Sequence, residues 1–119
     1  MIYWWFMTKD DEVYLRHIQE DIQLIEQYSQ DLTYSNFLEN KLIQDGVIRR
    51  LEIIGEAVKN LSEDIFMRFP QIPWKDWIGM RHKLIHGYFG VDLEIVWDTC
   101  IKDIPPLKEV IEETLKDYE

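Results

Sequence analysis

Apolar residues along this chain recur every three or four positions, the spacing at which side chains share one face of an α-helix. No run of β-branched residues bounded by turn residues suggests a strand. The clearest apolar faces predict one helix over about 9–28 and a second over about 36–61. Their members are Tyr14, Leu15, Ile18, Ile22 and Ile25 in the first helix and Val47, Leu51, Ile54, Val58 and Leu61 in the second. The pattern therefore predicts an all-α protein.

Polar residues predict where the first two helices begin. Thr8 and Asp11 are spaced as the N-cap and third residue of the first helix, and Asn36 and Glu39 as the capping box of the second. Residues 29–35 are polar and read as the connection between them. We therefore expect two long helices joined by a short loop.

Prolines and glycines divide the second half of the chain into shorter helices. A serine cap followed by a proline predicts a helix over 62–69, and Pro73 is placed at the first turn of a helix extending to about residue 86. We expect a further helix over 92–103, an interruption at Pro105-Pro106, and a last helix ending near residue 116. Short connections between amphipathic helices favour an antiparallel up-and-down bundle.

At 119 residues the chain forms one domain, which we place at 9–119 after an N-terminal extension or lead-in at 1–8. The aromatic run at 3–6 suggests docking against a partner, or an upstream extension with the natural start at Met7. The run is far too short to span a bilayer and lacks the features of a signal peptide. One cysteine, Cys100, excludes an intrachain disulfide, so we expect a cytoplasmic protein.

Charge is distributed unevenly. The formal net charge of −10 argues against nonspecific binding to nucleic acid. Residues 1–40 and 84–119 each carry a net charge of −6, whereas residues 41–83 carry +2. A focused site for an anionic substrate in an acidic protein would have this distribution, although ordinary variation between solvated helix faces would also produce it.

Two neighbouring residues of the second helix invite specific expectations. Gly55 lies within the apolar face, where glycine costs about 1 kcal/mol of helix propensity against alanine. We expect a neighbouring backbone to approach closely there. Glu56 is expected to pair with a basic side chain such as Lys59 or Lys75.

The candidate chemistry is concentrated in residues 79–88, which hold an arginine, two histidines and a tyrosine. Arg81 can neutralise a phosphate through a planar donor fork, and His86 can exchange a proton near neutral pH. On a regular helix the two residues lie about 140° apart. Either the helix loosens near Gly87, or the two side chains meet partners from a second copy of the chain. A twofold dimer would supply the two histidines that an acid and a base require.

Other interpretations of this segment compete with catalysis. His82 and His86 have the spacing of a metal clip, but Lys83 stands where zinc proteases need glutamate, so no metal is predicted. His86 could also be a hydrogen-bonded core or interface histidine, and Tyr88 a packed aromatic. No carboxylate pair, glycine-rich phosphate loop or cofactor motif stands out, so no cofactor is expected.

Arg81, His86 and Tyr88 form an Arg-x4-His-x-Tyr motif that resembles the signature of the HEPN superfamily, specifically the HepT-like toxins of bacterial and archaeal toxin–antitoxin pairs. The resemblance extends upstream to 50–57 and 72–74. It also extends downstream to Val91-Asp92 and Trp97, so it covers nearly everything after about residue 9. His82 departs from the pattern, because the family most often has a small polar residue after the arginine.

The resemblance implies a homodimeric helical bundle that acts as a metal-independent endoribonuclease through attack of a 2′-hydroxyl. Arg81 would bind the phosphate and stabilise the transition state, and His86 would act as general base or acid. His82 and Lys83 are candidate auxiliary residues. The further substrate-binding candidates are Lys41, Arg49 and Arg50. The implied partners are RNA, a second copy of the chain and a cognate minimal nucleotidyltransferase antitoxin (MntA-like) that attaches AMP to Tyr88. The alternative is a non-catalytic helical dimer that binds and regulates this nucleotidyltransferase.

Overall fold

The computed structural model describes the backbone of residues 2–85 and 90–119, and their side chains from Asp10 onward. The described part is helical apart from turns and one antiparallel bridge between Ile85 and Val91. Its elements are α1 (Ile2–Ser29), α2 (Tyr34–Glu39), α3 (Lys41–Lys59), α4 (Glu63–Arg68), α5 (Trp74–Ile78), α6 (Met80–Leu84), α7 (Leu93–Asp98), a π-helical turn (Thr99–Asp103), α8 (Ile104–Leu115) and a 3-10 turn (Lys116–Tyr118). The predicted all-α class is confirmed for these residues.

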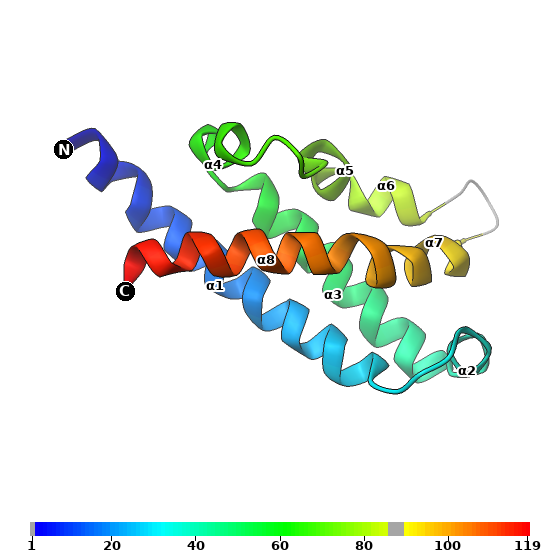
Figure 1. The fold of residues 1–119 in the computed structure, drawn as a ribbon. Coiled ribbons are helices and arrows are strands. Elements are labelled where there is room, and N and C mark those ends of the chain that lie inside the picture. Colours follow the sequence, from blue (N-terminus) through cyan, green and yellow to red (C-terminus); the bar gives the residue numbers. More distant parts are fainter. Residues whose placement is uncertain (1, 86–89) are drawn as a thin grey trace.

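The three long helices form the body of the molecule. Helix α1 packs against both α3 and α8, and α4, α5 and α6 follow one another along the top of the view (Figure 1). Helices α5 and α6 contact α3, whereas α6 also contacts α7. The segment that carries Arg81 therefore lies between α3 and the helix that continues into α8.

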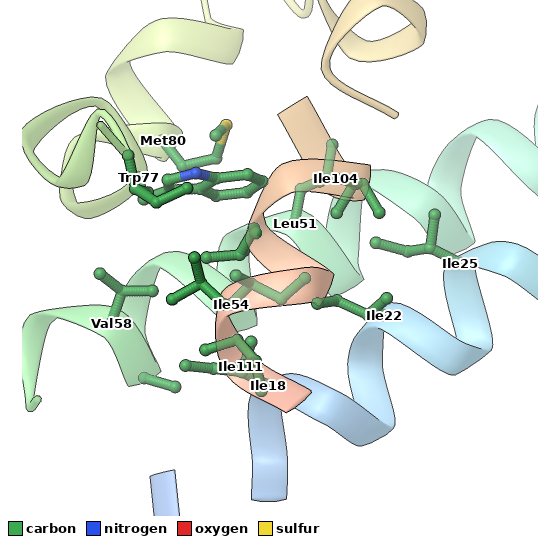
Figure 2. Close-up of a cluster of buried hydrophobic side chains, with 14 of the residues drawn as sticks. Ile18, Ile22, Ile25, Leu51, Ile54, Val58, Trp77, Met80, Ile104 and Ile111 are labelled. Carbon is green, nitrogen blue, oxygen red and sulfur yellow. The ribbon is translucent and has the colours of Figure 1, made fainter. Parts of the chain in front are cut away.

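The core lies where these helices meet, and its side chains point toward one another in Figure 2. Every residue of the two predicted apolar faces is buried except Tyr14, which is partly buried against the core. Trp77 of α5 and Met80 of α6 join the core from above and are each 1% exposed. Burying one such side chain stabilises the fold by about 1.5–3 kcal/mol, so α5 is held to the core by Trp74 and Trp77, and α6 by Met80 and Leu84.

Helix α1 begins earlier than the sequence predicted. Its helical backbone starts at Ile2, so Thr8 and Asp11 are not its N-cap and third residue. Asp11 is buried and bonds to another helix instead. Its Oδ1 accepts a hydrogen bond from the Ser62 N–H at 2.9 Å, and its Oδ2 accepts one from the Ser62 hydroxyl at 2.7 Å. Ser62 is the N-cap of α4, but its side chain makes no cap hydrogen bond. Its hydroxyl donates to the Asp11 carboxylate of α1 instead.

The predicted helix over 36–61 is divided at Asn40. The Asn40 Oδ1 accepts a hydrogen bond from the Ile43 N–H at 3.0 Å and so caps α3. Thr33 caps α2 in the same way, accepting from the Asn36 N–H at 3.1 Å. The predicted capping box at Asn36 and Glu39 is therefore wrong. Asparagine and threonine side chains compete for backbone N–H groups and start helices where the apolar pattern alone shows no break.

Two further predicted boundaries are also wrong. The helix predicted from Pro73 to about residue 86 is divided at Gly79, which adopts φ −89° and ψ 19° between α5 and α6. Pro105-Pro106 does not interrupt the last helix, because α7 continues through the π-helical turn into α8. Proline lacks an N–H, and in an α-helix its ring clashes with the carbonyl four residues earlier. The wider π-helical turn ends at Asp103, with Ile104 between it and the prolines, and it relieves that clash.

No helix within residues 2–85 and 90–119 is both long enough and apolar enough to span a membrane.

Cys100 is a free, partly buried thiol in the π-helical turn. Burial raises the pKa of this thiol to about 12, with a further contribution from the nearby Asp103 carboxylate. The thiol is therefore protonated and unreactive at neutral pH.

Candidate active site around Arg81

Arg81 lies at the edge of a surface cavity between α6 and α3. The cavity has a volume of about 220 Å³ and is lined by Arg49, Glu52, Ile53, Glu56 and Arg81. Arg81 is exposed and forms no ion pair with another described residue. Its guanidinium fork is therefore available to an anion that enters the cavity.

Close packing at Gly55 brings α5 and α6 against α3. A Cβ added to Gly55 would lie 2.5 Å from the Trp77 carbonyl oxygen and 3.1 Å from the Met80 Cβ. Only glycine permits this approach. The expectation of a close backbone contact at Gly55 is confirmed, and the contact has a consequence for the site. It places the helix of Arg81 directly beside the α3 turns that carry Arg49 and Glu56.

Glu52 and Glu56 are cavity residues that the sequence reasoning did not identify. They are spaced with Arg49 and Ile53 at three- and four-residue intervals, which puts all four on one face of α3. Glu56 was expected to pair with Lys59 or Lys75, but it forms no ion pair with a described residue. The helical spacing from Arg49 could have shown that the two carboxylates share its face.

The structure brings Arg49 and Lys41 toward this site. A second depression of about 400 Å³ adjoins the first through Arg49 and Glu52, and Lys41 lies at its far end. Lys41 also forms an exposed ion pair with Asp45, at 3.2 Å. Such a pair contributes little and exchanges readily with solvent or another anion. Two of the three predicted substrate-binding cations thus lie along one continuous surface from Arg81.

Arg50 is directed elsewhere. Its Nη1 donates a hydrogen bond to the Asp21 Oδ1 of α1 at 3.0 Å, and the Asp21 side chain is only 6% exposed. Burial raises the pKa of Asp21, and the hydrogen bond and charge of Arg50 partly oppose that rise. The structure therefore places Arg50 in the packing of α1 on α3 and not in either depression.

The two auxiliary candidates on α6 have different surroundings. His82 is exposed. Lys83 is about one-third exposed and forms an ion pair with Asp103 of the π-helical turn, with its Nζ 3.2 Å from the Asp103 Oδ2. Lys83 thus faces away from the α3 cavity and toward the last helix.

His86 and Tyr88 lie outside the described residues, so their predicted roles stay predictions. The described residues on either side of them are held together. The Asp92 N–H donates to the Leu84 carbonyl at 2.8 Å, and Ile85 forms its bridge with Val91. The described residues that flank the segment of the motif histidine and tyrosine, Ile85 and Val91, therefore lie side by side at the end of the helix that carries Arg81.

Metal binding was not predicted, and no cluster of three or more potential ligands among histidine, cysteine, aspartate and glutamate lies within reach of one ion in the described part of the chain. The chemistry that the described site offers is that of two guanidinium groups and two carboxylates. The guanidinium groups bind phosphate oxygens, and ionised carboxylates accept hydrogen bonds from hydroxyl and amino groups.

The sequence resembles proteins of one family over nearly its whole length. The family described as Ribonuclease HepT-like matches residues 18–114. A protein of Methanocaldococcus jannaschii named "Putative RNase MJ0127" is 47% identical over 111 residues, which cover 93% of this chain and 92% of that protein. One of Thermococcus cleftensis, named "Probable ribonuclease HepT", is 46% identical over 110 residues, covering 92% of this chain and 100% of the relative.

A further relative is longer than this chain. "Gamma-glutamylcyclotransferase and putative RNase MJ0434" of M. jannaschii is 52% identical over 105 residues, covering 88% of this chain but 47% of that protein, so the chain spans about half of its length. No solved structure matches the chain. The match over residues 18–114 includes Arg81 and every other residue of its cavity. The chain therefore belongs to the HepT-like ribonuclease family.

Proposed function

We propose that this chain is a metal-independent endoribonuclease and the toxin component of a toxin–antitoxin pair. The observation that carries the proposal is Arg81, an exposed guanidinium at the edge of a cavity that it shares with Arg49, in a family described as ribonucleases. The names of the relatives support the class of activity. The toxin role is the one that the Arg-x4-His-x-Tyr resemblance implies.

The reaction needs a proton acceptor, a proton donor and a cation. A base removes the proton of the ribose 2′-hydroxyl, whose oxygen attacks the adjacent phosphorus. The bond to the 5′-oxygen breaks, and an acid protonates that leaving oxygen. The products are a 2′,3′-cyclic phosphate and a 5′-hydroxyl. We assign the proton transfers to His86 and stabilisation of the phosphorane charge to Arg81.

One histidine cannot be base and acid in the same step, so we propose that the site is completed by a second copy of the chain. A twofold dimer that pairs the two Arg81 segments would bring two histidines and two arginines into one cleft. In that dimer one His86 would accept the 2′-hydroxyl proton, and the other would protonate the leaving group.

The charges of the two depressions suit RNA better than a free phosphate. Arg49 and Lys41 extend the positive groups away from Arg81 along α3, so they would neutralise neighbouring backbone phosphates. Glu52 and Glu56 would repel a bare anion, but they accept hydrogen bonds from ribose hydroxyls and from amino groups of bases. We propose that the RNA backbone follows this surface.

Cleavage of total cellular RNA by the purified protein in EDTA tests this proposal. Wild-type protein is expected to make discrete cuts whose products end in 2′,3′-cyclic phosphate, and His86→Ala is expected to make none. Circular dichroism and size-exclusion chromatography of both proteins would show whether the variant keeps its fold and its oligomeric state.

Three outcomes would contradict parts of the proposal. Equal cutting by His86→Ala would reject the histidine. Cutting only after a divalent metal is added would reject the metal-independent mechanism. No cutting by a folded wild-type dimer that still binds a nucleotidyltransferase would favour the regulatory module.

We also propose that a minimal nucleotidyltransferase antitoxin inactivates the enzyme by attaching AMP to Tyr88. The tyrosine oxygen would attack the α-phosphorus of ATP and release pyrophosphate. Because Tyr88 belongs to the same short motif as Arg81 and His86, the bulky anionic adduct would exclude RNA by its size and charge. Mass spectrometry after incubation with the partner and ATP is expected to show one added AMP on wild type and none on Tyr88→Phe. AMP on another residue would reject the assignment.

A further inference from the structure

Helix α6 is too short to fix its own orientation. It has five residues, Met80–Leu84, and a helix of that length is marginal without tertiary contacts. Met80 and Leu84 are each 1% exposed and hold one face of the helix in the core. Both contacts lie on one face of the helix, so the side chains on its flanks add to what sets its rotation about its axis.

Arg81 and Lys83 lie on opposite flanks of that buried face. With about 100° per residue, each lies about 80° from the direction between Met80 and Leu84, one on either side. Accordingly, Arg81 lines the cavity with α3, while Lys83 reaches Asp103 in the π-helical turn. A rotation of α6 that moved one of these side chains would also move the other.

The partner of Lys83 is itself held in place. Asp103 is the last residue of the π-helical turn, which the two following prolines favour. The Ile104 N–H bonds to the Thr99 carbonyl across this turn. Thr99 is 1% exposed, and its hydroxyl donates to the Ile95 carbonyl at 2.7 Å. The backbone of Asp103 is therefore held within a long helix, and its carboxylate is a partner against which a short helix can be positioned.

We propose that Lys83 is a positioning residue, whose ion pair with Asp103 sets the rotation of α6 and thereby holds Arg81 at the edge of the α3 cavity. For its effect on catalysis, the inference rests on the proposed ribonuclease function. It assigns no contact with RNA to Lys83. This distinguishes it from an auxiliary catalytic role, in which Lys83 would act on the substrate directly.

A double-mutant cycle in the full-length protein tests the proposal. Lys83→Ala and Asp103→Ala are each expected to lower kcat for RNA cleavage by about 10- to 100-fold, because a displacement of about 1 Å in a catalytic group has effects of that size. KM should change by no more than about twofold, since the cavity cations remain. The double variant should be no slower than either single variant.

Two variants that keep opposite charges at positions 83 and 103 test whether the lost cleavage rate can be recovered. Lys83→Arg and the exchange Lys83→Asp with Asp103→Lys restore opposite charges across the same gap and should recover most of the lost rate. Lys102→Ala is the matched control, because Lys102 pairs weakly with Asp98 on its own helix, at 3.9 Å. That variant should cleave at the wild-type rate.

Amide hydrogen exchange gives a readout that does not depend on cleavage. Both single variants should exchange faster than wild type over 79–85, with no change in α1, and the exchanged pair should be protected again. If Asp103→Ala cleaves at the wild-type rate while Lys83→Ala does not, Lys83 acts on the substrate and the proposal is wrong. Unchanged exchange in both variants would also overturn it. Absence of cleavage by the wild type would refute the proposed function, and the exchange data would then decide alone whether the pair orients α6.

Discussion

Replacing Arg81 with alanine is expected to lower the rate of RNA cleavage by about 10²- to 10³-fold, the usual effect of removing one group that stabilises transition-state charge. The stability of the fold should change by no more than about 0.5 kcal/mol, because the side chain is exposed and forms no ion pair with a described residue. The loss should appear in kcat, since the phosphorane carries more negative charge than the phosphodiester. Single-turnover cleavage with saturating enzyme measures this rate directly.

Three variants show whether the effect comes from the guanidinium of Arg81. Arg81→Lys keeps the charge but loses the planar fork, so an intermediate rate is expected. Arg49→Ala should mainly raise KM, because Arg49 lines both depressions and is assigned to the RNA backbone. Arg16→Ala removes an exposed arginine of α1, paired with Glu12 outside the cavity, and should have no effect. Wild-type cleavage by Arg81→Ala would remove Arg81 from the mechanism.

Gly55→Ala is expected to destabilise the protein by about 2 kcal/mol. The new Cβ would meet the Trp77 carbonyl oxygen at 2.5 Å, and Trp77 is only 1% exposed and cannot move outward without opening the core. Overpacking of this kind costs about 3 kcal/mol at the upper end of its usual range. The helix propensity of alanine returns about 1 kcal/mol. Urea denaturation followed by circular dichroism measures the difference in free energy of unfolding.

Gly46→Ala is the matched control in the same helix. Its Cβ would lie 3.2 Å from the ring of Tyr28, which is partly exposed and can shift. We expect Gly46→Ala to leave the stability unchanged or to increase it. Alanine adds the same helix propensity as at Gly55, but the Tyr28 ring can move away from the new Cβ. Equal effects at both glycines would mean that the contact of α3 with Trp77 does not limit the packing.

Gly55→Ala should also slow cleavage in its folded state, since it moves Arg81 away from Arg49.

The buried half of each long helix was predictable, because the residues that hold α1 and α3 together repeat with the helical period. Ile18, Ile22 and Leu51 are buried as their spacing indicates. Gly55 was predictable for a related reason, since a glycine in an apolar helical face has few uses besides close packing. The Arg81 segment was recognised from its motif.

The errors come from interactions that the local pattern does not contain. Asp11 is spaced in sequence as the third residue of a helix capped by Thr8, but its partner is Ser62, 51 residues away. Arg49 and Arg50 are adjacent and equally basic, yet Arg50 pairs with the buried Asp21 of another helix, whereas Arg49 lines the cavity. The continuous helix across Pro105-Pro106 requires a π-helical turn, and apolar periodicity does not distinguish such a turn from a break.

The contact between Asp11 and Ser62 also bears on the order in which the chain folds. Helix α4 has six residues, and a carboxylate from α1 bonds to the serine before its first turn, so it is marginal before α1 has docked. The segment that follows it leads directly into α5 and the helix of Arg81. A contact across 51 residues forms late, because closing a long loop costs entropy before the contact stabilises it. The α1–α3 pair would then assemble first, and the part of the chain that carries the arginine would become ordered in the final stage of folding.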